Sequence, residues 1–246
     1  MEVHHHAHTE RKKWTHYLWE FLMLFLAVTL GFFVENQREH LIEHKREKQY
    51  ILTLIEDLKS DTAQLATGID GRWQKEQMVD SLVFVLNSPE ASRQGSNIYY
   101  WGYNVLRPSR FFPNDRTIQQ LKNAGNMRLI RKMPVSDSIM AYDQQVKRLM
   151  EVISEENDIR IQFREFTKKI FDGNILFYIP DKEKGIFNRP PGNPQLVKTD
   201  KATINELLVT LQMTQHVMRV GRRNQERLKK TATELIVFLK EEYHLN

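Results

Sequence analysis

Residues 21–34 read FLMLFLAVTLGFFV, a run of fourteen residues without a charged side chain. As a helix this run would be about 21 Å long, which is shorter than the roughly 30 Å hydrocarbon core of a bilayer. Residues 14–20 extend the helix to about 21 residues, and Trp14 and Trp19 supply rings suited to the headgroup region. The sequence therefore predicts a transmembrane helix over residues 14–34.

Other interpretations of this segment are a buried core helix, a helix lying in the bilayer interface, or a cleaved signal peptide. Basic residues at positions 11–13 followed by an apolar run are also typical of a signal peptide. The exit from the run, residues 31–37, has no small-x-small cleavage pattern. The sequence thus favours an uncleaved signal anchor, with the lipid bilayer as the partner of residues 14–34.

The orientation of this anchor is not decided by charge. Three basic residues precede it at positions 11–13, and four follow it soon after: Arg38, Lys45, Arg46 and Lys48. The positive-inside rule therefore gives nearly equal counts, but a long domain is translocated largely regardless of its charge. We expect the tail, residues 1–13, to lie inside and the C-terminal part outside.

Composition excludes several classes of function. The 246 residues are 41% hydrophobic, and the 36 basic and 31 acidic residues are interspersed, which argues for one or two folded domains and against nucleic-acid binding. The absence of cysteine excludes disulfides, thiolate zinc sites and cysteine nucleophiles. Neither a phosphate-binding glycine loop nor a serine nucleophile elbow is present. We expect a protein that is not an enzyme and holds no cofactor.

The N-terminal sequence carries a family resemblance. The segments MEVHHHAHTERKKW, EFLMLFLAVTLGFFVENQREH and YILTLIEDLKSD together resemble an uncharacterised family of single-span membrane proteins of the Bacteroidota. Residues 116–130, RTIQQLKNAGNMRLI, are similar to an element of related families in which a membrane helix precedes a helical domain. The resemblance implies a Gram-negative inner membrane with the domain in the periplasm, and it implies no activity.

Beyond the apolar run, the sequence predicts an all-α fold. Residues 35–49 are almost wholly polar and predict a solvated stalk, and residues 50–246 predict an elongated antiparallel helical bundle with irregular connecting loops. Long helices are expected over 51–86, 136–171 and 200–243, with a short helix ending at Gly125 and at most a small strand pair within 174–197. The buried stripe of the first is predicted to include these residues: Ile51, Ile55, Leu58, Leu65 and Ile69. The pattern can continue through Trp73, Val83 and Leu86, and the alternative is an interruption at Gly68 and Gly71.

Residues 88–114 show no helical period but are rich in aromatic residues. One interpretation is that the rings cap the open end of the bundle. The other is a stacking surface for a glycan, a peptide or a partner, with two arginines available for an anionic group. The candidate interaction residues are Tyr99, Tyr100, Trp101, Tyr103, Arg107 and Arg110.

Histidines suggest a metal-dependent alternative. His40, Glu43 and His44 match H-x-x-E-H, in which two histidines one helical turn apart share a zinc ion and the glutamate activates water. A membrane-tethered zinc hydrolase is therefore the alternative function, although a polar stalk offers no pocket that excludes water. The histidines within residues 4–8 predict weak metal affinity in a tail.

Two further charged groups are expected to be solvated. A basic band lies within the last helix, from Arg219 to Lys230, and acidic residues follow one another at Glu155, Glu156 and Asp158. The sequence as a whole predicts a membrane-anchored envelope protein for protein–protein interaction or scaffolding, with ligand sensing as a variant. Its expected partner is an unidentified membrane or envelope protein, or a second copy of the chain.

Overall fold

The computed structural model describes residues 14–123 and 125–245, which divide into two compact units, 1–50 and 51–246. The described residues are almost entirely helical, so the prediction of an all-α fold is confirmed. The longest helix, α1 (Trp14–Leu86), contributes residues to both units. The histidines at positions 4–8 lie outside the described residues.

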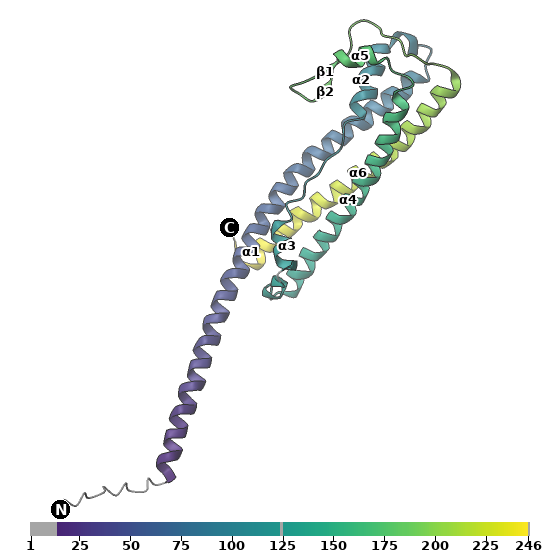
Figure 1. Cartoon of the computed structure of the whole chain (residues 1–246). Coiled ribbons are helices and arrows are strands. Elements are labelled where there is room, and N and C mark those ends of the chain that lie inside the picture. The colour runs from purple at the N-terminus through teal and green to yellow at the C-terminus, as the bar shows by residue number, and fades with distance from the viewer. Residues whose placement is uncertain (1–13, 124, 246) are drawn as a thin grey trace, which may run out of the picture. The chain divides into compact units, whose positions relative to one another are not determined.

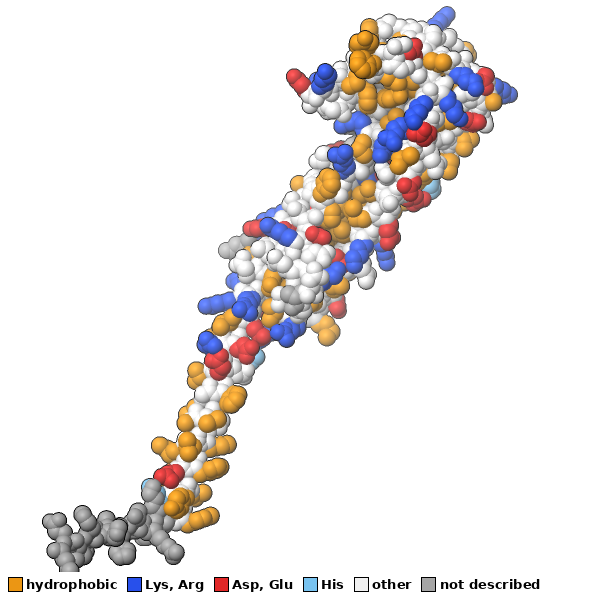
Figure 2. Space-filling model, viewed as in Figure 1, with side chains coloured by type: hydrophobic (Ala, Val, Ile, Leu, Met, Phe, Trp, Pro, Cys, Tyr) orange, Lys and Arg blue, Asp and Glu red, His pale blue; other side chains and the backbone are white. Residues whose placement is uncertain are grey.

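In the first unit, the apolar part of α1 is exposed. Its most apolar window has a mean hydropathy of 2.0 and no buried residue, and α1 is the one helix among the described residues that is long and apolar enough to cross a membrane. Trp14 is 80% exposed and Phe32 is 75% exposed. Figure 2 shows hydrophobic side chains along this part of the helix. No other residue within 14–123 and 125–245 covers these side chains, which is what a lipid-facing helix requires.

The second unit is a bundle of three long helices, formed by the remainder of α1, α4 (Met133–Thr167) and α6 (Lys201–Glu242) (Figure 1). The ion pair between Lys132 and Glu242 joins the start of α4 to the end of α6, so these helices are antiparallel. α1 and α4 run parallel, because a long connection returns the chain to the end of the bundle at which α4 begins.

The connections contain the remaining elements. A 3-10 turn η1 (Ala91–Arg93), α2 (Gly95–Val105), α3 (Arg116–Asn123) and η2 (Asn126–Leu129) lie between α1 and α4. Between α4 and α6 lie α5 (Gly173–Tyr178) and an antiparallel pair of two-residue strands, β1 (Pro180–Asp181) and β2 (Ile186–Phe187). The strand pair agrees with the expectation for residues 174–197, but helix α5 contradicts the expectation that this segment contains at most a strand pair.

Helix α2 contradicts the expectation that residues 88–114 have no helical period. Ile98, Tyr99, Gly102 and Val105 are buried at helical spacing. A Cβ atom at Gly102 would lie 2.6 Å from Cζ of Phe171, so glycine is required for the ring to pack against the helix. A glycine adds no apolar side chain to the stripe, and the hydrophobic pattern therefore missed the helix.

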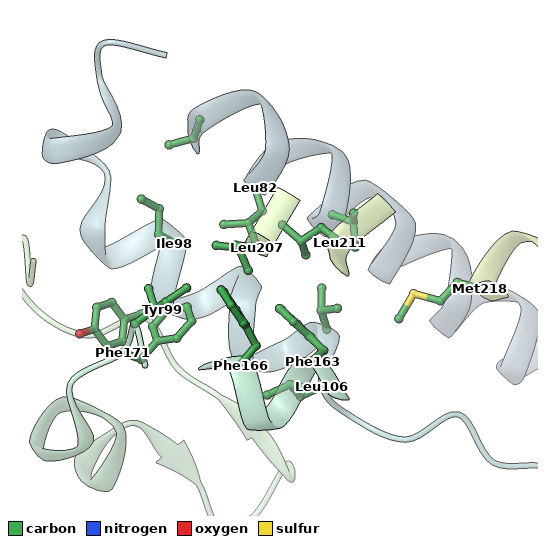
Figure 3. Packing of buried hydrophobic residues seen from close by; sticks show 14 residues of the cluster. Leu82, Ile98, Tyr99, Leu106, Phe163, Phe166, Phe171, Leu207, Leu211 and Met218 are labelled. Atoms are coloured by element: carbon green, nitrogen blue, oxygen red, sulfur yellow. The ribbon is translucent and has the colours of Figure 1, made fainter. Parts of the chain in front are cut away.

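A hydrophobic cluster joins α1, α2, α4 and α6 at one end of the bundle (Figure 3). Leu82 of α1, Phe163 of α4 and Leu207 of α6 are each 0% exposed. Phe171, which follows α4, packs edge-on against Tyr99 of α2 with 4.9 Å between ring centroids. Burying a side chain of this kind contributes about 1.5–3 kcal/mol, so this cluster fixes α2 and the start of the α4–α6 connection on the bundle.

The buried stripe of α1 differs in part from the prediction. Ile51, Leu58 and Leu65 are fully buried as expected, but Trp73 is 54% exposed and its neighbour Arg72 is 1% exposed. Gly68 and Gly71 do not interrupt the helix. The buried face of α1 includes Arg72 because Gly221 of α6 leaves room for the guanidinium. A Cβ atom at Gly221 would lie 2.8 Å from Nε of Arg72.

Candidate functional site

The predicted aromatic residues do not form one exposed patch. Tyr99 is 0% exposed, and its hydroxyl oxygen accepts a hydrogen bond from the backbone N–H of Asp172 (2.8 Å) and donates to the carbonyl oxygen of Gln195 (3.2 Å). Burial raises the pKa of this hydroxyl. Tyr99 therefore acts within the fold, where it ties α2 to the α4–α6 connection.

The neighbouring rings also contact the α4–α6 connection. Tyr103 is half-buried and packs edge-on against Phe171 and Phe187, with centroid distances of 5.3 and 5.2 Å. The guanidinium of Arg189 lies 4.0 Å from the ring centre of Tyr100, which is a cation–π contact. Trp101 is half-buried and packs against the hydrophobic cluster. These contacts favour the capping interpretation of the aromatic residues.

The most exposed aromatic pair lies on α5. Phe177 is 78% exposed and Tyr178 is 83% exposed, and their ring centroids are 5.3 Å apart. Asp172 caps this short helix by accepting a hydrogen bond from the backbone N–H of Asn174. Ile179 is buried and Ile175 is half-buried, so α5 turns the two rings away from the bundle. The spacing of these isoleucines, four residues apart, was the signal in the sequence that residues 177 and 178 face outward.

Arg107 and Arg110 lie on an extended segment, residues 106–115, that returns along α1. Its backbone polar groups cannot bond within a helix, and side chains of α1 bond them instead. Nζ of Lys75 donates to the carbonyl oxygen of Arg107 (2.6 Å), and the side-chain amide of Gln64 bonds both the N–H (3.3 Å) and the carbonyl oxygen (3.0 Å) of Phe112.

Two buried carboxylates of α1 hold the end of this segment. Oδ1 of Asp61 accepts from the backbone N–H of Asn114 (2.8 Å), and its Oδ2 accepts from the hydroxyl of Tyr142 on α4 (2.6 Å). Asp57 accepts from the hydroxyl and N–H of Thr117 in the first turn of α3 and from Nε of Arg116 (2.7 Å). Asp57 thereby supplies to α3 a cap that comes from another helix.

Two clefts flank residues 108–110. The first, of about 470 Å³, lies on the α4 side and is lined by residues that include Met150 and Arg160. The second, of about 420 Å³, lies on the α1 side and is lined by residues that include Arg72, Lys75 and Arg107. Arg110 lines both. We call these two cavities the basic clefts.

A buried ion pair lies between the basic clefts. Nη2 and Nε of Arg72 donate to Oε2 of Glu156 at 2.6 and 3.2 Å, and Oε1 of Glu156 accepts from the hydroxyl of Ser109 (2.6 Å). Glu156 is only 6% exposed, so the expectation that it is solvated was wrong. It is buried because it balances Arg72, whose burial unpaired would be costly.

Lys75 is also a buried cation. Its Nζ donates to the hydroxyl of Ser109 (3.0 Å) as well as to the carbonyl of Arg107, and its side chain is 8% exposed. Burial lowers the pKa of Lys75 to about 8; the charge of Glu156 opposes this, whereas the charges of Arg72, Arg107 and Arg160 lower it further. The basic clefts therefore have an excess of positive charge.

The H-x-x-E-H motif lies on the exposed part of α1 in the first unit. The side chains of His40 and His44 are 49% and 66% exposed, Nδ1 of His40 lies 3.9 Å from a carboxylate oxygen of Glu43, and Nδ1 of His44 lies 3.5 Å from one of Glu47. Among residues 14–123 and 125–245, no group of three potential metal-binding side chains gathers. The structure thus offers the motif neither a third ligand nor an enclosed site within the described residues.

Part of the basic band of α6 is engaged within the fold. Nε of Arg222 donates to Oε1 of the buried Glu76 on α1 (2.8 Å), and Arg219 approaches the same carboxylate at 3.8 Å. Arg223 and Arg227 are exposed. The band is therefore partly an ion-pair network between α1 and α6 and partly a solvated face.

The chain matches no protein-family model, no curated protein and no solved structure.

Proposed function

We propose that this protein is a non-enzymatic, membrane-anchored envelope protein whose helical unit, residues 51–246, binds a partner protein through α5. The observation that carries the proposal is the pair of outward-facing rings of Phe177 and Tyr178, which are 78% and 83% exposed. Aromatic residues are enriched at the centres of protein interfaces because a ring contributes a large contact area at a small entropic cost. Two adjacent rings exposed on a short, capped helix suit this role.

The anchor supports the membrane part of the proposal. The apolar segment, residues 14–34, combines a length sufficient for a bilayer with side chains that are exposed among the described residues. We place the protein in the inner membrane of a Gram-negative cell with residues 51–246 in the periplasm, which is what the family resemblance implies. A partner there would be another membrane or envelope protein.

Site-specific photo-crosslinking tests the proposal in native membranes. A photoreactive phenylalanine analogue replaces Phe177 in the full chain, and after irradiation the adducts are resolved by mass. We expect one discrete adduct with a different envelope protein, and we expect a Tyr178→Ser substitution to reduce its yield, since both rings would contact the same partner.

The same analogue at Phe84, which is 76% exposed on α1, is the matched control. Equal adducts from positions 84 and 177, or no adduct from 177, would contradict a docking role for α5. An adduct of twice the mass of the chain would identify the partner as a second copy and would contradict a different envelope protein.

A further inference from the structure

The basic clefts contain more positive charge than the fold neutralises. Five cationic side chains line them: Arg72, Lys75, Arg107, Arg110 and Arg160. The acidic residue among the lining residues is Glu156. Glu156 pairs with Arg72. Within the described part of the chain, none of the other four cations forms an ion pair with a carboxylate.

This excess is unusual within the bundle. Of the other buried charged side chains on α1, Glu76 forms an ion pair with Arg222, and Asp57 forms an ion pair with Arg116. Lys75 is buried to a similar degree, but its partners are a carbonyl and a hydroxyl, which carry no charge. Keeping a charge on the buried Lys75 beside other cations is unfavourable unless an anion joins them.

Hydrogen-bonding capacity is also left unused. Nη1 of Arg72, a side chain that is 1% exposed and lines the α1-side cleft, has no hydrogen-bond partner among the described residues. Nε of Arg160, which lines the α4-side cleft, is also buried without a partner. Guanidinium groups bind carboxylate and phosphate oxygens through paired hydrogen bonds, so such donors suit an oxyanion.

We propose that the α1-side basic cleft is a binding site for a small molecule that carries at least two phosphate or carboxylate groups. The anionic groups would lie near Lys75, Arg107 and Arg110, which all line this cleft. The α4-side cleft lies across residues 108–110 and is not part of this site. Binding here does not depend on the orientation of the anchor or on a partner at α5.

Calorimetric titration of the full chain in detergent tests this site. Pyrophosphate and citrate are the probes, acetate is the comparator, and the ionic strength is held constant in metal-free buffer. We expect saturable binding of pyrophosphate or citrate at one site per chain, and no saturation by acetate. The tighter of the two probes identifies phosphate or carboxylate as the preferred group.

The double variant Arg107→Gln/Arg110→Gln removes two exposed cations. The backbone carbonyl of residue 107 remains, so it can still accept the hydrogen bond from Nζ of Lys75. We expect it to weaken binding at least about tenfold, because each charge-assisted hydrogen bond contributes on the order of one power of ten in affinity. The matched control Arg223→Gln/Arg227→Gln removes the same charge from α6, at residues that line neither cleft.

Binding that persists in the control and is weakened in the first variant, with unchanged unfolding temperatures for both, supports the site. Absence of saturable binding by either probe overturns it. Equal weakening in the two double variants also overturns it, because only the net charge of the protein would then matter.

Discussion

Residues 14–34 of α1 expose large apolar side chains, whereas residues 51–86 of the same helix bury charged ones. Leu24 is 67% exposed in the first stretch, and Asp61 is 1% exposed in the second. The difference shows that each stretch is matched to a particular environment. The first has no apolar cover from the part of the chain that the structure describes, and the second receives its polar partners from residues 106–117, α4 and α6.

The largest expected effect comes from placing charge in the apolar stretch. A Leu26→Arg/Val28→Arg variant would lose membrane insertion, because each arginine near the centre of a transmembrane helix costs about 2.5–3.5 kcal/mol. Leu41→Arg is the control, since Leu41 is also exposed but lies outside the apolar segment. Membrane fractionation with alkaline extraction checks this, and retention of the double variant in the membrane would contradict a lipid-facing segment.

The next effect tests the buried charges of the second stretch. Glu156→Ala leaves Arg72 buried without its carboxylate, and we expect the free energy of unfolding to fall by about 3–5 kcal/mol. Glu155→Ala removes an exposed carboxylate one residue away and should change it by less than about 0.5 kcal/mol. Denaturant titration measures both, and equal effects would show that the Arg72–Glu156 pair is not buried.

A smaller effect concerns pH. The pKa of Lys75 is about 8 in the folded protein against an ordinary value of 10.5, so between these values the unfolded chain binds a proton that the folded chain does not. Stability should therefore rise with pH across this interval, by about 1 kcal/mol between pH 7 and pH 9 from this group. A Lys75→Met variant should lack that part of the rise. An identical pH profile in both proteins would contradict a buried, charged Lys75.

The smallest effect concerns the attachment of residues 106–115 to α1. Gln64→Ala removes both side-chain bonds to the backbone of Phe112, at a site that remains partly open to water. We expect a loss of about 1 kcal/mol in the free energy of unfolding and faster hydrogen exchange at the amide of Phe112. Unchanged exchange at that amide would show that Gln64 does not hold the segment.

The apolar periods of the sequence were sufficient to predict the three long helices. Ile51, Leu58 and Leu65 on α1 and Phe163 on α4 are buried as their spacing indicated. Hydrophobicity could not identify Arg72 as an inward residue, because its burial depends on Glu156, which is 84 residues away, and on the lack of a side chain at Gly221. The spacing from Leu65 through Gly68 to Arg72 was nevertheless regular.

The candidate site was predicted only in part. Arg107 and Arg110 were identified as residues for an anionic group, but the other cations of the basic clefts come from α1 and α4 and meet only after the chain folds. Four aromatic residues from Tyr99 to Tyr103 were grouped by composition, whereas the exposed ring pair, Phe177 and Tyr178, belongs to α5. Composition identifies which residues are available for contact. The direction of each side chain depends on the helix that carries it, and α2 was missed because Gly102 adds no apolar side chain to its buried stripe.

In the proposed topology, residues 14–34 cross the membrane and separate the N-terminal tail from the helical unit. Because the chain has no cysteine, single cysteines at Thr9→Cys and Arg223→Cys report the two sides without background labelling. In intact spheroplasts, a membrane-impermeant maleimide should label the Arg223→Cys protein at once and the Thr9→Cys protein only after lysis. Labelling of both proteins in intact spheroplasts, or of the Thr9→Cys protein alone, would contradict the proposed membrane topology.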